Sequence, residues 1–276
     1  MRTSGAIMAL LAVPAAMACP RRGSTRPHPS TTAVPATTST TTILGSAQSS
    51  SSSSSSSAPL ASEASEASKA TVPAVAGSTA VTGTSTFYGG NLNGGTCSFS
   101  TYTLPSGVFG TAFSGSAWNS AAQCGACIEV TANGKSITAM IVDKCPECDA
   151  GHLDLFQNAF NVLSPSSTDP LATSYTFVKC PISSPLILHN KSGTSPYWFS
   201  MQVVNANEAV SKLEVSTDGG STWKSTTRQD YNFFENSSGF RTDTVAVRVT
   251  SQSGSTVVVK NVSVASDSQV TASSNF

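Results

Sequence analysis

Short runs of alternating apolar and polar residues recur between residue 82 and Pro181, and they predict mostly strands. These predicted strands, each bounded by Gly, Asn or Pro, cover residues 84–88, 127–131, 136–142 and 174–178. One segment, 155–163, has helical spacing instead, with Asp154 placed to cap its start and Pro165 to end it. Many short strands with a single helix favour a small β-barrel.

After Pro181 the pattern predicts strands alone, at residues 186–189, 197–204, 212–216, 244–250 and 256–264. Two turn sequences, Asp218-Gly219-Gly220 and Ser253-Gly254, lie between these runs and predict hairpins. Regular turns without a helix favour a β-sandwich. Prolines and serines interrupt the pattern between Cys180 and Pro185, so we expect a first domain at 82–181 and a second at 182–276.

The first 81 residues have a different composition. A short basic start, an apolar run at 6–17 and the sequence Ala16-Met17-Ala18 predict a secretory signal peptide at residues 1–18. A membrane anchor needs about 20 apolar residues, and this run contains Pro14. Residues 19–81 are rich in Ser, Thr, Ala and Pro, so they cannot bury enough apolar surface to offset the entropy of folding. We expect a disordered Ser/Thr-rich stalk there, either a plain spacer or O-glycosylated.

The charge balance argues against two classes of partner. Charged residues are 11% of the chain and the formal net charge is zero. Nucleic acid and anionic membranes attract proteins through clustered positive charge, so we expect neither as a partner. We expect a monomer.

Seven cysteines allow two interpretations. Four of them, Cys124, Cys127, Cys145 and Cys148, have the spacing C-x2-C-x17-C-x2-C, which in an intracellular protein indicates a zinc ribbon. The predicted secretion and two further cysteines, Cys97 and Cys180, favour three disulfides among these six, with no metal and no cofactor. Fifteen pairings are possible among six cysteines. The seventh, Cys19, lies at the predicted cleavage point.

Three acceptor sequons lie in the second half, at Asn190, Asn236 and Asn261, and predict a glycosylated surface there. Together with the signal peptide, they predict a secreted protein, extracellular or in a cell wall.

The acids of the first half gather in one stretch: Asp143, Glu147, Asp149 and Asp154. An acidic loop that runs into a helix start could present a carboxylate in a groove. A helix cap at Asp154 and a solvated loop at Glu147 and Asp149 explain the same residues without any function.

Four motifs occur in the order seen in the expansin superfamily. They are Thr86-Phe87-Tyr88-Gly89, Cys124-Gly125-Ala126-Cys127, Val142-Asp143-Lys144-Cys145-Pro146 and His152-Leu153-Asp154-Leu155. The chain resembles this superfamily over residues 82–264. The resemblance implies an all-β protein: a six-stranded double-psi β-barrel like that of family-45 glycoside hydrolases, then an immunoglobulin-like β-sandwich, a family-63 carbohydrate-binding module.

The resemblance also implies roles in the barrel groove. Asp154 matches the position of the hydrolases' general acid, and Asp143 and Thr86 match further groove residues. The hydrolases need a second carboxylate just after the strand that carries Thr86, but no acid occurs between Tyr88 and Cys97. Inversion at a sugar carbon needs an acid and a base, and a general base contributes typically 10²–10⁴-fold. Cys145 stands where bacterial expansins have an aromatic groove residue.

In the second domain, Tyr197, Trp198 and Tyr231 match the three in-line aromatic residues of the family's cellulose-binding face, and Lys191 matches a polar position near it. Neighbouring residues on a strand point to opposite faces, so Tyr197 and Trp198 need a strand start or a bulge to share one face. We assign Trp223 to packing.

These observations predict a secreted, non-hydrolytic, plant-type cell-wall loosening protein that binds cellulose and related β-glucans. A weak endoglucanase of the family-45 type and a non-catalytic wall-binding structural protein are the alternatives.

Overall fold

The computed structural model describes residues 78–166 and 169–276. The predicted signal peptide, Cys19 and the predicted stalk up to residue 77 lie outside the described residues. The first strand begins at Val81, one residue before the predicted start of the barrel.

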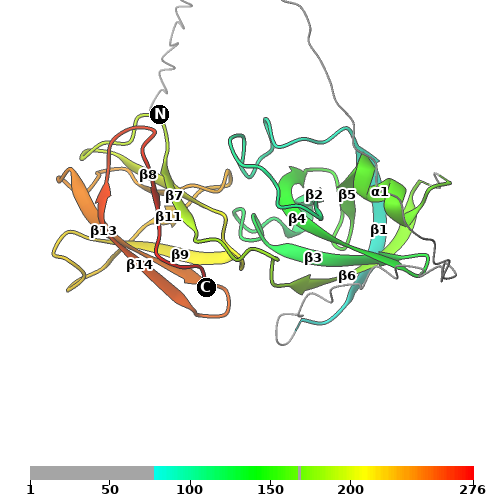
Figure 1. Cartoon of the computed structure of the whole chain (residues 1–276). Coiled ribbons are helices and arrows are strands. Elements are labelled where there is room, and N and C mark those ends of the chain that lie inside the picture. The colour runs from blue at the N-terminus through cyan, green and yellow to red at the C-terminus, as the bar shows by residue number, and fades with distance from the viewer. Residues whose placement is uncertain (1–77, 167–168) are drawn as a thin grey trace, which may run out of the picture. The chain divides into compact units, whose positions relative to one another are not determined.

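Six strands close into a barrel, and one short helix follows the fifth strand (Figure 1). The elements are β1 (Val81–Tyr88), β2 (Val108–Ser114), the 3-10 turn η1 (Gly115–Ala117), β3 (Cys127–Ala132), β4 (Lys135–Cys145), β5 (Leu153–Phe156), α1 (Gln157–Leu163) and β6 (Leu171–Val178). Their order around the barrel is β1-β5-β2-β4-β3-β6, in which β1 pairs in parallel with β5 and β2 with β4. The predicted six-stranded double-psi barrel is confirmed.

The prediction for residues 154–163 is partly wrong. Leu155 lies in β5 and the helix begins only at Gln157, with Phe156 at its N-cap position. Asp154 is therefore not a helix cap: its backbone pairs with Thr86 on β1 and with Ala112 on β2. The helical spacing is real, but closing the barrel requires a strand here, so pairing with two neighbours overrides the local pattern.

Strand β2 escaped prediction because it shows no alternation. Six of its seven residues are buried, so its sequence, Val-Phe-Gly-Thr-Ala-Phe-Ser, lacks the regular polar positions of a half-exposed strand. Gly110 is required at its position, because a Cβ there would lie 2.4 Å from the ring of Phe156.

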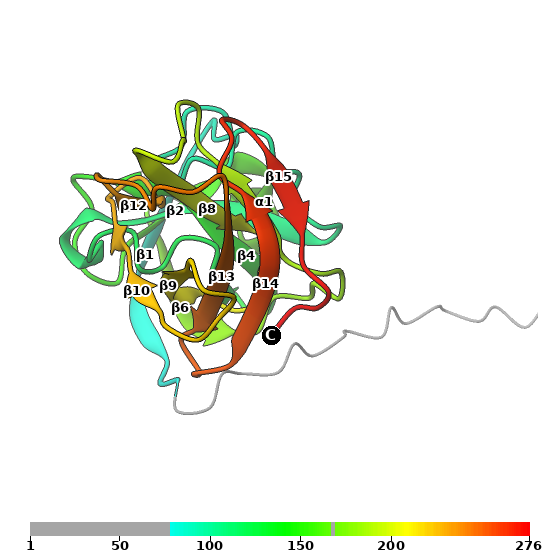
Figure 2. The same ribbon diagram turned by 90° about the vertical axis from the view of Figure 1, so that its left-hand side faces the viewer.

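The remaining strands form a β-sandwich of two sheets, as predicted. The strands are β7 (Ile187–Asn190), β8 (Phe199–Val204), β9 (Val210–Ser216), β10 (Lys224–Ser225), β11 (Thr227–Arg228), β12 (Phe234–Asn236), β13 (Thr244–Ser251), β14 (Thr256–Ser263) and β15 (Gln269–Thr271). One sheet has the order β10-β9-β13-β14, of which β13 and β14 run side by side in Figure 2. The other has the order β11-β12-β8-β7-β15. Alternate residues of β8, such as Phe199 and Met201, fill the core between the sheets.

Three disulfides tie the barrel: Cys97–Cys124, Cys127–Cys180 and Cys145–Cys148. They use every sulfur of the C-x2-C-x17-C-x2-C pattern, so the zinc-ribbon alternative is wrong, because zinc needs free thiolates. Within 78–166 and 169–276 no group of three or more His, Cys, Asp or Glu could hold a metal ion. Across the same residues, no helix has the length and apolar character needed to cross a bilayer.

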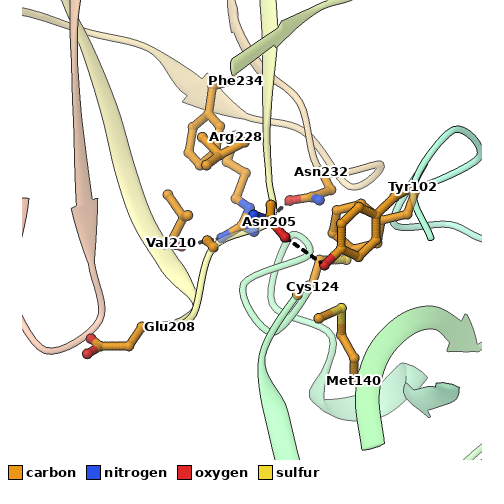
Figure 3. Close-up of a pocket in the computed structure, with 13 residues that line it drawn as sticks. Tyr102, Cys124, Met140, Asn205, Glu208, Val210, Arg228, Asn232 and Phe234 are labelled. Carbon is orange, nitrogen blue, oxygen red and sulfur yellow. Dashed lines mark hydrogen bonds between the residues drawn. The ribbon is translucent and has the colours of Figure 1, made fainter. Parts of the chain in front are cut away.

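Barrel and sandwich share hydrogen bonds along the outer face of the five-stranded sheet. Gln202 and Asn232 both donate side-chain N–H groups to the carbonyl of Cys97, at 2.8 and 3.2 Å. The hydroxyl of Tyr102 donates to Asn205 Oδ1 at 3.1 Å, the dashed line in Figure 3. Gln202 points away from the core between the two sheets, and its contact with the barrel explains why it is nevertheless buried.

Arg228 lies at the same junction without an acidic partner (Figure 3). Its guanidinium donates to the carbonyl of Val210 at 2.6 Å and to Asn232 Oδ1 at 2.7 Å, and it lies 5.1 Å from the ring of Phe234. No carboxylate of the described part of the chain lies within 4.0 Å of it, and its Nε has no hydrogen-bond partner there. Burial lowers the pKa of Arg228 to about 10, which leaves it charged at neutral pH.

Candidate functional site

Three side chains predicted to lie in the groove, Thr86, Asp143 and Asp154, gather with Tyr88 on the outer face of the barrel. Thr86 on β1 pairs with Asp154 on β5, and Ala112 on β2 pairs both with Asp154 and with Asp143 on β4. Residues directly opposite each other on paired strands point to the same side. Ala112 belongs to a small cluster separate from the barrel interior, so its partners point outward too. We call Thr86, Tyr88, Asp143 and Asp154 the acidic face.

Asp154 is half-buried and held by one strong hydrogen bond. Thr86 Oγ1 donates to Asp154 Oδ1 at 2.7 Å. Burial raises the pKa of Asp154 above its ordinary value, the Thr86 bond and the charge of His152 oppose this, and the charges of Glu147 and Asp169 add to it. The carboxyl therefore keeps its proton to higher pH than free aspartic acid, which suits a group that donates to an oxygen.

Asp143 is tied to the backbone. Its Oδ1 accepts the N–H groups of Thr96, at 2.7 Å, and of Lys144, at 2.8 Å. Its Oδ2 lies 3.4 Å from the hydroxyl of Tyr88. Burial and the charges of Asp143 and Asp154 raise the pKa of Tyr88, so the phenol stays protonated and can donate. Asp143 thus fixes the loop around Thr96 beside the acidic face.

Asp143 is a second carboxyl group near Asp154. One strand, β2, separates β4 from β5 in the barrel, so the two backbones are about 9–10 Å apart at strand spacings of ~4.8 Å. Inverting glycosidases place two carboxyl groups roughly 6.5–9.5 Å apart. The chain lacks an acid just after Tyr88, but Asp143 puts a second carboxyl group on the same face, two strands away from Asp154.

A disulfide occupies the position where an aromatic residue was expected. Cys145 is buried against Cys148 and Ala112, and Tyr88 packs on this cluster. Tyr88 is therefore the aromatic side chain that this part of the acidic face offers to a ligand.

In the sandwich, Tyr197 and Trp198 precede the strand that was predicted to contain them. Strand β8 begins at Phe199, and Trp198 pairs only with Ser195 in an isolated bridge. The alternation of a regular strand therefore does not force the two rings to opposite faces. Tyr197 is 65% exposed, with Arg241 4.9 Å from its ring, and Trp198 is half-buried.

Lys191 and Tyr231 do come together. Lys191 Nζ lies 5.9 Å from the ring of Tyr231 and 5.7 Å from that of Phe233. The Tyr231 hydroxyl donates to Glu235 Oε1 at 2.6 Å, and Ser200 Oγ donates to the same oxygen at 2.9 Å. Burial, with the Glu235 bond and charge, raises the pKa of Tyr231 to about 12. The aromatic ring of Tyr231 is thus held in place by polar groups. We call the five residues Lys191, Ser200, Tyr231, Phe233 and Glu235 the Tyr231 cluster.

Trp118 is a residue that sequence reasoning missed. It is 3% exposed, and its indole N–H donates to the carbonyl of Asp230 at 3.1 Å. Lys144, next to Asp143, lies 5.8 Å from its ring. Trp118 thus connects the acidic face with the residue before Tyr231. Nothing in its local sequence marked it, because the contact joins segments more than a hundred residues apart.

His152 is the second missed residue. The motif His152-Leu153-Asp154 carries it, but no role followed from the pattern. On a strand, residues two apart point to one side, and this spacing was the available signal. Its ring lies within hydrogen-bonding distance of Thr84 and Thr86.

The sequon prediction is wrong for Asn190. This residue is 1% exposed, and its amide nitrogen, the atom that carries a glycan, donates to the carbonyls of Ser263 and Ala265 and to Ser268 Oγ. Asn236 is half-buried and Asn261 is exposed, so glycosylation at these two stays a prediction.

The fold and the acidic face together define a double-psi β-barrel protein. Residues 103–180, from the segment before β2 to the last barrel cysteine, match the Barwin family.

Matches that extend beyond the barrel narrow the class. The chain is 31% identical over 179 residues to Expansin-YoaJ of Bacillus subtilis (strain 168), covering 75% of it and 63% of this chain. It is 29% identical over 209 residues to Expansin-like protein 5 of Dictyostelium discoideum, covering 86% of that protein and 72% of this chain. The crystal structure of an apo Clavibacter michiganensis expansin superposes with a TM-score of 0.64 at 28% identity, covering 71% of this chain and 98% of that one. The chain belongs to the expansin family.

Proposed function

We propose that this expansin is a secreted protein that binds cellulose and related β-glucans and loosens cellulose-rich walls without cutting their chains. The observation that carries the proposal is the acidic face: Asp154 has a raised pKa and a fixed partner, whereas Asp143 is engaged by two backbone N–H groups. A Clavibacter michiganensis expansin has been solved in complex with cellohexaose, which supports a glucan as the ligand.

The acidic face offers the hydrogen bonds that separate one glucan chain from another. Asp154 and the hydroxyl groups of Thr86 and Tyr88 can take up sugar hydroxyls that would otherwise pair with a neighbouring chain. Each such exchange replaces one hydrogen bond with another, so the net free energy is small and the process needs no bond cleavage.

The sandwich supplies adhesion. A ring that covers ~50 Å² of a sugar's apolar face contributes about 1.2 kcal/mol at ~25 cal/mol/Å². Tyr197, Trp198 and Tyr231 together give roughly 3–4 kcal/mol, which corresponds to weak binding by one patch. Weak binding suits a protein that must shift along a polymer.

A weak inverting hydrolase is the second candidate, and the strand register favours considering it. Asp154 would protonate the leaving oxygen, and Asp143 is the carboxylate placed to activate water. Asp143 Oδ1 is occupied by the N–H groups of Thr96 and Lys144, and a water that approaches Oδ2 has to displace the hydroxyl of Tyr88. We therefore propose wall loosening as the function in preference to hydrolysis.

A reducing-end assay beside a cellulose pull-down separates the candidates. We expect no sugar release from the wild type, Asp154→Asn or Asp143→Asn, and weaker pull-down of Trp198→Ala. Trp223→Ala is the matched control, because Trp223 lies beside Arg248 of the other sheet. Sugar release that either acid substitution abolishes would establish the hydrolase. Wall creep unchanged in Asp154→Asn would favour a purely structural wall-binding protein.

The proposal includes the processing and organisation expected from the sequence. It takes residues 1–18 as the secretion signal, 82–181 and 182–276 as the two domains, and Asn236 and Asn261 as glycan acceptors. It also takes the protein to act as a monomer. The three disulfides support an oxidising, extracellular compartment.

A further inference from the structure

Three consecutive hydrogen bonds connect the exposed side of β1 with Asp154. Thr84 Oγ1 lies 3.1 Å from His152 Nδ1, and His152 Nε2 lies 3.0 Å from Thr86 Oγ1. Thr86 Oγ1 then donates to Asp154 Oδ1 at 2.7 Å. Thr84 is exposed and the other three residues are half-buried, so the line leads from solvent to the carboxyl.

The barrel brings these groups together through the pairing of β1 with β5 and one close approach. His152 directly precedes β5, and its ring and the carboxyl group of Asp154 both contact Thr86 on the parallel strand β1. A Cβ on Gly83 would lie 2.2 Å from the carbonyl oxygen of Gly151. Any side chain at position 83 would therefore push β1 away from the turn that carries His152.

The hydrogen bonds fit two arrangements of one added proton. In the first, the imidazole of His152 is a cation: Nδ1–H donates to Thr84, Nε2–H donates to Thr86, and Thr86 donates to the Asp154 carboxylate. In the second, His152 is neutral and Asp154 is a carboxylic acid: Asp154 donates to Thr86, Thr86 donates to Nε2, and Nδ1–H still donates to Thr84. Every bond is kept, and two of them reverse direction.

We propose that His152 is a positioning residue that shares one proton with Asp154 through the Thr86 hydroxyl, and so decides whether Asp154 faces the polysaccharide as an acid or as a carboxylate. The transfer balances. The proton on Nε2 moves to Thr86 Oγ1 as the proton of Thr86 moves to Asp154 Oδ1. The imidazole becomes neutral because it loses a proton, the carboxylate becomes a neutral carboxylic acid because it gains one, and no other group changes its charge.

The surroundings favour sharing. Burial raises the pKa of Asp154, so its carboxyl group holds a proton to higher pH than free aspartic acid does. The charged groups that act on Asp154 are His152 itself and the acids Glu147 and Asp169, and Asp143 faces it across β2. No Lys or Arg of the described chain is among them, so His152 is the cation that acts on Asp154.

This inference rests on the proposed function for its use, because a glucan has to reach Asp154. A sugar hydroxyl donates more strongly to a carboxylate than to a carboxylic acid. A glucan that binds Asp154 should therefore draw the shared proton to His152, which holds it until the sugar leaves. Binding would then need no proton exchange with the solvent.

A titration without sugar tests the shared proton. In the full chain labelled with ¹³C and ¹⁵N, we expect the Asp154 carboxyl carbon and both His152 ring nitrogens to respond to the same two pH steps. Thr86→Val keeps the branched shape without the hydroxyl, and there each group should follow a single step of its own. His189, whose ring faces Phe233, should titrate in one step in both proteins.

Independent single steps of Asp154 and His152 in the wild type would overturn the proposal, whether or not the Thr86 variant folds. A second measurement tests the use of the proton. Calorimetry with cellohexaose in two buffers of different ionisation enthalpy should show no proton exchange for the wild type and proton release for His152→Gln. Equal exchange in both would refute the storage role. Absence of binding in both would count against the proposed function and leave the titration result standing.

Discussion

The barrel and the sandwich reach stability by different routes. The barrel carries all three disulfides, and one of them, Cys127–Cys180, closes a segment with a sequence separation of 53. The sandwich has no cysteine after Cys180 and depends on a core that includes Phe199, Leu213 and Val247. The acidic face of the barrel holds polar groups fixed by hydrogen bonds, whereas the residues that stabilise the sandwich lie between its two sheets. In the barrel, the three disulfides add stability that the acidic face, as a polar surface, does not contribute by core packing.

The largest expected effect tests this contrast directly. Replacing Cys127 and Cys180 with Ala should destabilise the barrel by about 4 kcal/mol, because the unfolded chain regains the entropy of a 53-residue loop. Urea unfolding should then show the barrel melting before the sandwich, with His152 and His189 as the reporters of each part. An equal loss of stability in the barrel and in the sandwich would mean that the two unfold as one unit.

A smaller effect is expected at the junction. Arg228→Met removes the bonds to Val210 and Asn232, leaving polar groups buried without partners, at a cost of about 2 kcal/mol. The unfolding transitions of barrel and sandwich should also separate. Lys212→Met is the matched control and should change little, because Lys212 is exposed and the buried Glu214 keeps its hydrogen bond from Arg248. An unchanged free energy of unfolding in Arg228→Met would show that this guanidinium contributes no net stability.

Binding should depend on the sandwich in smaller steps. Trp198→Ala should weaken cellulose binding by about 1.2 kcal/mol, roughly sevenfold in Kd, through the loss of one ring contact. Asp154→Asn should leave this Kd nearly unchanged, which a depletion isotherm on crystalline cellulose would measure. A larger loss from Asp154→Asn than from Trp198→Ala would place adhesion on the barrel and reverse the division of labour.

The smallest expected effect is a change in how the free energy of unfolding depends on pH. Because burial raises the pKa of Asp154, the folded protein binds more protons than the unfolded chain at pH values just above 3.8, and the stability of the wild type falls as pH rises through that window. Asp154→Asn lacks this term, so its stability relative to the wild type should rise over the same window and then stay level. Denaturant unfolding at several pH values measures it. A relative stability that falls as pH rises would show that the carboxylate is the form stabilised by folding.

The sequence predicted the barrel fold correctly but not the limits of all its strands and its helix. The motif around Asp154, with its nearby cysteines and its resemblance to a known family, predicted a carboxyl group in a groove, and Asp154 lies on the acidic face beside Thr86. The same stretch misled the secondary-structure prediction, because residues 155–163 satisfy helical spacing while residues 153–156 are needed as a strand. Only the pairing with β1 and β2 decides between them.

The sequence by itself determined which residue types were available: six cysteines in one half, a Thr-x-Tyr strand, an acid two positions after a histidine, and Tyr and Trp residues in the other half. Tertiary structure decided which of them meet. Asn190 satisfies its sequon but is buried, Asp143 satisfies the acid pattern but is bound by backbone N–H groups, and Trp118 matters only through Asp230. The reason is physical: hydrogen bonds, burial and distance between segments far apart in the chain arise on folding, and no local pattern encodes them.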